Sequence, residues 1–492
     1  MIVKTIRGVV AFLLLATVAF GIGDNSPLAA AEKTENFDKP PNWHGFNNRS
    51  NVFEPRTITQ NFGYSATQHA GGNGPGEFGG TITPAAEPAY YARKIRPKNF
   101  EETLTASGTF KSVAGHGNVL IGFFNADTIN EWRTPNTVAL RIYGRGDVFY
   151  AYVEYMSQKW RAGADSPQPF PMVKDPESGR ETFKGFASNL KHRWSLKYDP
   201  KANNGDGAVI ATIDDVTAVC HLDKGHKADG AIFNRFGLLN VVKSADTSGE
   251  IWIDDVEVNG ETEAFDNDPK WQEFQNRREY ISDGVRPRFD FGYSNTNHAV
   301  GNNRGELGGT VFRGDNRTPD KMAAFGDRLK RLSLDKPLVA SGKVVLRRAV
   351  SDSTALIGFY NSRESLKSSD SQRSGLPNSF LGVAIEGPSR DGFFFYPAGN
   401  VGSGPLAGNY GDSPQILPDE SSHDWSFKYE PTADGGGVAT VSLDGKGSTL
   451  RISADDRKLG ATFDRFGIVT TWIDGNQQLI YFDDLTYTWN QE

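Results

Sequence analysis

A glycine-rich segment over 64–81 contains more hydrogen-bonding side chains than its neighbours, including Tyr64, His69 and Glu77. A carboxylate accepts hydrogen bonds, an imidazole donates or accepts them, and glycine lets the backbone approach a ligand closely. Together these groups could bind the hydroxyl groups of a sugar. In the alternative interpretation, residues 76–80 form a tight turn and Glu77 only holds backbone amides.

The same groups recur in the second half of the chain, at Tyr293, His298 and Glu306, with unchanged spacing. Other patterns also occur twice: Phe-Asp followed by Pro, Trp, Phe, Asn and Arg from 37 and from 265, Arg-Phe-Gly at 235–237 and 465–467, and Asp-Asp at 254–255 and 483–484. Such self-similarity marks repeated structural units. Units of about 230 residues suit whole domains better than solenoid repeats of about 20 to 45 residues. We therefore predict an internal duplication.

The N-terminal residues resemble an export signal. Lys4 and Arg7 precede an apolar run over 9–20, and small residues at 29–31 match a cleavage site. We predict a signal peptide over 1–31, a first repeat over 32–262 and a second repeat over 263–492. The mature protein would then be secreted, whether periplasmic, extracellular or on the cell surface. A retained N-terminal anchor is the alternative.

Composition excludes several kinds of partner. The formal net charge is −7, and acidic and basic residues are interspersed, so nucleic acid and anionic lipid are not expected partners. After the first apolar run, no stretch approaches the length of a membrane-spanning helix, so we expect no membrane insertion of the mature chain. The single cysteine, Cys220, cannot pair within its own chain and is expected to be buried. We expect a monomer.

Apolar residues alternate with polar ones in both halves, which is the period of a half-buried strand. The clearest examples are Trp194, Leu196 and Tyr198, with Trp425, Phe427 and Tyr429 in the second half. Another alternating segment contains Phe149, Tyr150 and Tyr152, matched by Phe393, Phe394 and Tyr396. Rings that point outward from a sheet can stack on pyranose faces, so we select Tyr152 and Tyr396 as candidate binding residues. Packing in the core is the alternative.

One acidic pair interrupts the last strand of each half: Asp254 with Asp255 in the first, and Asp483 with Asp484 in the second. The apolar residues around each pair are spaced by two, three and two positions, which predicts a β-bulge at the pair. The carboxylates could also supply oxygen ligands to Ca²⁺, which takes about six to eight of them. Two carboxylates are too few alone, so a purely structural role stays open. No other cofactor is predicted.

Several of these patterns follow one another in a fixed order: Trp-x-x-x-Tyr, a glycine-rich turn, a strand ending at Asp214 or Asp444, Arg-Phe-Gly and a closing aromatic-Asp-Asp strand. The order resembles the concanavalin A-like lectin/glucanase family of jelly-roll sandwiches, which includes laminin G-like modules. The resemblance implies an all-β protein with two tandem antiparallel jelly-roll β-sandwich domains, each with a concave sheet. It also implies a bias toward sugars but no particular reaction.

The catalytic pattern of that family, Glu-x-Asp-x-x-Glu, does not occur in this sequence. We therefore expect a secreted, non-catalytic, lectin-like protein with two related sites for carbohydrate or polysaccharide. One alternative is a glycoside-active enzyme with His69 or Glu77 as its acid or base. The other is a structural cell-surface protein.

Overall fold

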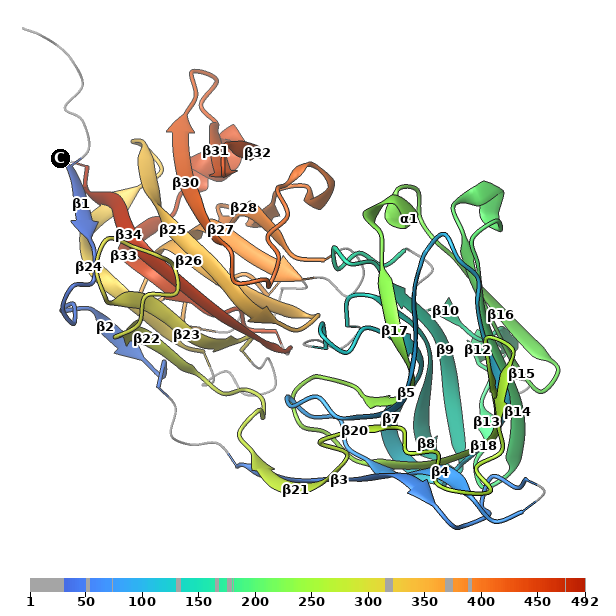
Figure 1. Ribbon diagram of the computed structural model, residues 1–492. Helices are drawn as coiled ribbons and strands as arrows, with labels where there is room; N and C mark the ends of the chain where they lie inside the picture. The colour runs from blue at the N-terminus through green and yellow to red at the C-terminus, as the bar shows by residue number, and fades with distance from the viewer. Residues whose placement is uncertain are drawn as a thin grey trace, which may run out of the picture.

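The computed structural model describes residues 31–49, 54–72, 74–129, 134–163, 168–174, 179, 181–314, 322–367, 375–387, 392–473 and 475–491. Residues 1–30 of the predicted signal peptide lie outside this part of the chain. The described residues form two antiparallel β-sandwiches that lie next to each other (Figure 1). The predicted all-β class is confirmed.

Two sheets face each other across the core of the first sandwich. One sheet contains, in order, β16 (Val216–His221), β15 (Ala208–Ile213), β14 (Lys191–Asp199), β6 (Leu104–Ser112), β18 (Gly249–Val258), β4 (Glu77–Ile82), β3 (Arg56–Ser65) and β21 (Arg277–Ser282), with β19 (Glu261–Glu263) paired to β18. The other contains β10 (Gln168–Pro169), β9 (Val148–Met156), β8 (Thr137–Gly146), β7 (Gly115–Phe124), β17 (Ile232–Asn240), β5 (Tyr90–Asn99) and β20 (Gln272–Phe274), with β13 (Phe186–Ala187) paired to β9. β11 (Met172–Lys174) and β12 (Glu181–Phe183) pair with each other and form a separate two-stranded sheet.

The second sandwich also has two sheets. One contains β22 (Asp290–Ser294), β23 (Glu306–Phe312), β34 (Gln477–Asn490), β25 (Leu338–Ala349), β30 (Ser422–Pro431), β31 (Gly437–Leu443) and β32 (Lys446–Ile452), with β1 (Ala31–Glu35) paired to β34. The other contains β2 (His44–Phe46), β24 (Ala324–Ser333), β33 (Thr462–Val469), β26 (Ser353–Tyr360), β27 (Phe380–Gly387), β28 (Phe394–Val401) and β29 (Gly404–Ala407). The described helices are short: η1 (Asn203–Gly205), α1 (His226–Asp229), η2 (Tyr410–Asp412) and α2 (Ala454–Leu459). Within the described ranges, no helix is long and apolar enough to cross a membrane.

The alternating strands bury the residues that the sequence pattern predicts. Trp194, Leu196 and Tyr198 point into the core of the first sandwich, and Cys220 lies in the same core. The hydroxyl of Tyr198 donates a hydrogen bond to the carbonyl oxygen of Phe100 at 2.8 Å, so its polar end is satisfied inside the core. In the second sandwich, Trp425, Phe427 and Tyr429 take the corresponding inward positions.

The predicted β-bulge in the last strand of each half is confirmed. The pairing of β18 with β6 shifts register between Asp254 and Glu257, and Asp255 has a φ of 49°. The pairing of β34 with β25 also shifts register, and Asp484 has a φ of 48°. One extra residue in each strand returns the later side chains to the same face.

Each sandwich is completed by a segment that we call an arm. The first arm, residues 31–49, lies on the second sandwich, where β1 pairs with β34 and β2 pairs with β24. In Figure 1 the blue β1 lies along the red β34. The second arm, residues 261–282, lies on the first sandwich through β19, β20 and β21.

The sheets therefore do not divide at the boundary predicted between 262 and 263. Asn259 and Gly260 have φ values of 50° and 87°, which is the geometry of a two-residue hairpin turn with both central residues at positive φ. This turn folds the second arm back onto β18 instead of leading it to the second sandwich. The first sandwich thus extends to residue 282, and the second takes its first strands from residues 31–49.

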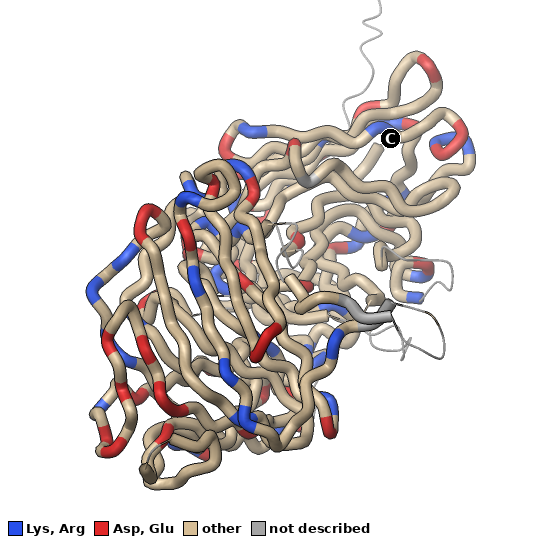
Figure 2. The backbone as a smooth tube through the Cα atoms, turned by 90° about the vertical axis from the view of Figure 1, so that its right-hand side faces the viewer, with Lys and Arg blue, Asp and Glu red and all other residues tan. Residues whose placement is uncertain are grey.

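Hydrogen bonds also link the two sandwiches. Gln415 donates from Nε2 to the carbonyl oxygen of Lys159 at 2.8 Å, and Ser244 donates from Oγ to Oδ1 of Asn476 at 3.2 Å. Charged residues of both signs are interspersed over the face shown in Figure 2. This distribution agrees with the interspersed charges of the sequence.

Candidate functional site

The outward face of β8 and β9 in the first sandwich brings tyrosine and arginine side chains together. Along β9, Phe149 and Val153 are fully buried in the core, whereas the half-buried Tyr150 and Tyr152 point to the opposite face. Successive residues of a strand point to opposite faces, so this arrangement follows directly from the period of two. The predicted outward position of Tyr152 is therefore what the structure shows.

Pairing of the two strands places arginines beside these rings. Arg141 is the register partner of Tyr152, and its guanidinium lies 4.3 Å from the centre of the Tyr152 ring. Arg145 lies 4.3 Å from the ring of Tyr143, which is two residues earlier on the same strand. A guanidinium over an aromatic face is an attractive cation–π arrangement, which holds both groups in a fixed orientation.

A buried ion pair supports this arrangement from one side. Nε of Arg141 lies 2.9 Å from Oε1 of Glu154, and the two side chains are only 9% and 1% exposed. Burial raises the pKa of Tyr152, and the positive charge of Arg141 opposes that rise. The Tyr152 phenol is thus neutral near pH 7 and can donate a hydrogen bond.

Phe183 extends the aromatic surface beyond the two strands. Its ring centre lies 6.0 Å from that of Tyr150 and 5.9 Å from that of Tyr152, and its side chain is 40% exposed. We call this surface the tyrosine face, and it consists of Arg141, Tyr143, Arg145, Tyr150, Tyr152 and Phe183. Flat rings with polar edges beside guanidinium groups can stack on a sugar and bind its oxygen atoms.

The corresponding face of the second sandwich is arranged differently, and it corrects the prediction for Tyr396. The side chain of Tyr396 is 3% exposed and packs in an apolar cluster with Phe380 and Leu376. Its hydroxyl donates to Glu386, which also accepts from Arg313 at 2.6 Å. Because the ring is buried and the hydroxyl occupied, Tyr396 is a packing residue and does not offer a binding surface.

The glycine-rich segment of each half is built around a buried glutamate. Glu77 is fully buried, and its two carboxylate oxygens accept hydrogen bonds from the backbone amides of His69 and Ala70, each at 2.7 Å. Glu306 is also fully buried, and it accepts from the amides of His298 at 2.9 Å and Ala299 at 2.8 Å.

The prediction that Glu77 and Glu306 contact a ligand is therefore wrong in this structure. A carboxylate with no exposed surface and with amides bound to both oxygens cannot also hold a sugar hydroxyl. The alternative interpretation, in which the glutamate only fixes the turn, describes both Glu77 and Glu306. Charge-assisted hydrogen bonds of this kind are stronger than neutral ones, which explains why a glutamate serves here.

The other residues of these segments do not meet the glutamates in one open pocket. The exposed His69 packs its ring 4.7 Å from the ring of Trp252. His298 packs at the same distance from Tyr481. Tyr64 and Tyr293 are half-buried. The backbone carbonyl of Tyr64 accepts a hydrogen bond from the guanidinium group of Arg277, and that of Tyr293 accepts one from Arg49; both arginines belong to the arms.

The acidic pairs do not present two carboxylates to one ion. Asp254 is fully buried while Asp255 is exposed, and Oδ1 of Asp254 accepts from the amide of Asp255 at 2.7 Å. Asp483 and Asp484 repeat this bond at 2.7 Å, and Asp484 accepts from the side chain of Asn302. In the described part of the chain, no group of three or more His, Cys, Asp or Glu residues could hold a metal. The expected calcium ligands are therefore not brought together.

Burial has a clear effect on the inner aspartates. It raises the pKa of Asp254 to about 6 and that of Asp483 to about 7, with smaller contributions from the neighbouring aspartate and from Glu77 or Glu306. Oδ2 of each inner aspartate is buried without a hydrogen-bond partner among the described residues. Burial therefore favours the protonated form of these two carboxyl groups over a wider pH range than for an exposed aspartate.

Sequence reasoning found Tyr152 but missed Arg141, Tyr143 and Arg145. A signal was present, because these three residues alternate with the buried Leu140 and Ile142 along β8. Two outward arginines and a tyrosine on a strand that pairs with an aromatic strand indicate a polar surface and not a core. The contribution of Phe183 had no comparable signal, since it depends on how the β11–β12 hairpin folds over β9.

Comparison with known proteins adds little to this site. No protein-family model matches the sequence, and no curated protein matches it. Among solved structures, the alginate lyase Aly36B is 12% identical with a TM-score of 0.25, covering 37% of this chain and 80% of its own. The carbohydrate recognition domain of Emp47p is 11% identical with a TM-score of 0.21, covering 41% of this chain and 88% of its own. The binding domain of botulinum neurotoxin serotype C1 is 8% identical with a TM-score of 0.21, covering 85% of this chain and 98% of its own. At these TM-scores the likeness assigns the chain to no family.

Proposed function

We propose that this protein is exported and binds a polysaccharide on the tyrosine face of its first sandwich. The observation that carries the proposal is the outward row of Tyr150 and Tyr152, with Arg141 fixed over Tyr152 by its buried bond to Glu154. Outward residues of one strand are about 7 Å apart, so two rings offer two separate stacking surfaces along a sugar chain. The arginines and phenols provide hydrogen bonds to its oxygen atoms.

A non-catalytic role fits the carboxylates of this protein. Glu77 and Glu306, the acids considered for an enzyme, each bind two backbone amides and have no exposed surface. Glu154 is 1% exposed and forms an ion pair with Arg141, so it has almost no surface to offer a substrate. We propose one binding face and not two, because the second sandwich buries Tyr396 at the matching position.

The proposal is tested by measuring glycan binding of residues 32–492 on an array and then by calorimetry. Tyr152→Ala should weaken binding about tenfold, since losing roughly 1.4 kcal/mol of ring contact changes an affinity by that factor. Phe183→Ala should weaken it less, because this ring lies at the edge of the face. Phe274→Ala is the matched control, since Phe274 is 39% exposed and lies on β20, away from β8 and β9. Equal binding by wild type and Tyr152→Ala, with unchanged melting temperatures, would refute the proposal.

A further inference from the structure

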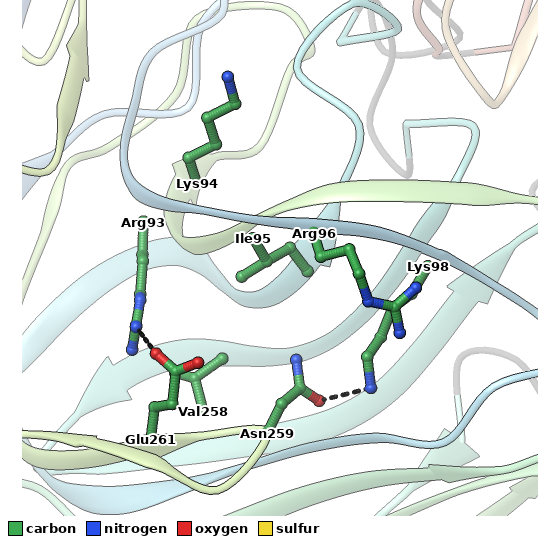
Figure 3. Close-up of a pocket in the computed structure, with 8 residues that line it drawn as sticks. All are labelled: Arg93, Lys94, Ile95, Arg96, Lys98, Val258, Asn259 and Glu261. Carbon is green, nitrogen blue, oxygen red and sulfur yellow. Dashed lines mark hydrogen bonds and ion pairs between the residues drawn. The ribbon is translucent and has the colours of Figure 1, made fainter.

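A cavity of about 360 Å³ lies where β5 meets the turn between β18 and β19 (Figure 3). We call it the β5 pocket, and its lining residues are Arg93, Lys94, Ile95, Arg96, Lys98, Val258, Asn259 and Glu261. The volume lies within the range of small-molecule sites, which is about 300 to 1,000 Å³. Four of the eight lining residues are cationic and one is acidic, although the whole chain carries a net negative charge. The pocket is therefore a local positive region.

Three of the four cations of the β5 pocket contact neighbouring polar groups. Arg93 forms an ion pair with Glu261, which Figure 3 shows. Arg96 forms an ion pair with Glu102. Nζ of Lys98 donates to the carbonyl oxygen of Thr103 at 2.6 Å and to Oδ1 of Asn259 at 3.3 Å. Fixed donors lose less entropy on binding than free surface lysines do.

Arg96 and Lys98 are like charges brought close together. Burial lowers the pKa of Lys98, the carboxylate of Glu102 raises it, and the positive charge of Arg96 makes a smaller lowering contribution. An anionic oxygen close to Lys98 and Arg96 would restore the charge stabilisation that burial removes from Lys98. This arrangement favours an anionic ligand over a neutral one.

The corresponding strand of the second sandwich, β24, keeps two of these four cations and replaces the other two. Lys98 of β5 pairs with Phe233, whereas Leu332 of β24 pairs with Phe463. Arg93 follows Ala92 on β5, whereas Asp327 follows Gly326 at the corresponding place on β24. Lys94 and Arg96 correspond to Arg328 and Lys330, which are also cationic. The fold therefore does not need cations at positions 93 and 98, and these two residues distinguish the β5 pocket from the second sandwich.

We propose that the β5 pocket binds one acidic sugar unit through its carboxylate or sulfate group. Arg96 and Lys98 bind the anionic oxygens, while Asn259 and Glu261 lie on the opposite wall and can bind ring hydroxyls. This site is separate from the tyrosine face, which lies on β8 and β9, and it does not depend on ligand binding there.

The test uses residues 32–492 with glucuronic acid, a glucose sulfate and glucose as probes, followed by calorimetry or by NMR of the ligand. Glucuronic acid or the sulfated sugar should bind, glucose should not, and the preferred anion identifies which group the pocket takes. Lys98→Met should weaken binding at least tenfold, because it keeps the aliphatic stem and removes the charge. Arg96→Gln should have a similar effect.

Lys330→Gln is the matched control for charge, since Lys330 lies at the corresponding position of β24 and makes the same change in net charge. Failure of both acidic sugars to bind, or equal weakening by Lys330→Gln and Arg96→Gln, would overturn the proposal. A protein that binds glucuronic acid but no polysaccharide would refute the proposed function while supporting the β5 pocket, so the two failures are distinguishable.

Discussion

The two arms make the same contacts with opposite charges. In the first arm, the Phe37 and Trp43 rings lie 5.3 Å apart at 70°, and in the second, Phe265 and Trp271 lie 5.2 Å apart at 68°. The ion pairs are reversed, however. Lys33 of the first arm contacts Asp327 at 2.6 Å, whereas Glu261 of the second arm contacts Arg93.

The reversed ion pairs show how two arms with similar ring contacts can each dock on one sandwich and not on the other. The apolar rings would fill either core, so burial alone does not select the correct sandwich. If the arms were exchanged, Lys33 would face Arg93 and Glu261 would face Asp327. Like charges at such a contact penalise the wrong pairing more than the correct pair stabilises the right one. The ion pairs therefore act mainly on specificity.

The arms also differ in how they reach their sandwich. The second arm follows β18 through a two-residue turn, so its contacts are local in sequence. The first arm pairs with β34, so its contacts join residues 31–35 to residues 485–490 across most of the chain. Closing such a long loop costs more conformational entropy than closing a short one.

The largest effect is expected from removing a buried ring of the first arm. Trp43→Ala should lower the free energy of unfolding of the second sandwich by about 3 to 5 kcal/mol, as is usual for such core truncations. Urea unfolding measures this, and Trp271→Ala is the matched variant in the second arm. Limited proteolysis should then cut residues 31–49 of Trp43→Ala but spare 261–282 of Trp271→Ala, because only the second arm is joined to a strand of its own sandwich by a two-residue turn. Equal cutting of both arms would contradict the difference in tethering.

The next effect concerns the inner aspartates and pH. Their folded-state pKa values are raised above the ordinary 3.8, to about 6 for Asp254 and about 7 for Asp483. The protonated form is thus favoured by folding, so this stability is fully present below pH 4 and is lost as pH rises toward 6 in the first sandwich and 7 in the second. Asp483→Asn should remove the part of the pH dependence that Asp483 contributes and stabilise the second sandwich at pH 8 by about 2 kcal/mol.

Calcium provides the control for this prediction. If Asp483 held Ca²⁺, the ion would raise the melting temperature of the wild type at pH 8, and Asp483→Asn would lower it. Thermal unfolding with calcium and with a chelator separates the two cases. We expect no calcium effect, because Asp484 points away to Asn302.

Much of the fold could be predicted because its signals are local. The alternation at Trp194 and Tyr198 and the changed spacing around Asp254 each lie within one strand, and both appear in the structure. The destination of the first arm could not be predicted, since the pairing of β1 with β34 depends on tertiary contacts. A local sign of the second arm's path was nevertheless available, because Asn259-Gly260 is a strong hairpin signal.

The candidate site was only partly predictable for a different reason. A glutamate that binds a ligand and one that ties down a turn are equally retained in a repeat, so only burial could decide the role of Glu77. The outward position of Tyr152 followed from the strand period. Its pairing with Arg141 required the register between β8 and β9, which the sequence does not specify by itself.

The smallest effects should come from reversing the arm charges one at a time. The side chain of Asp327 is 7% exposed and that of Lys33 is 38% exposed, whereas Glu261 is 72% and Arg93 26% exposed. Lys33→Glu should therefore lower the free energy of unfolding by about 1 to 2 kcal/mol, because it places a like charge beside a buried carboxylate. Glu261→Lys should cost under about 1 kcal/mol, since its pair is largely in solvent.

The neutral variants Lys33→Met and Glu261→Met separate loss of the pair from repulsion. Urea unfolding at low and high salt measures all four variants. If the ion pairs select the arms, each charge reversal costs more than its neutral variant, and salt reduces that excess. Equal losses for Lys33→Glu and Lys33→Met would show that only the attraction matters, and the apolar rings and chain connectivity would then have to place the arms without help from charge.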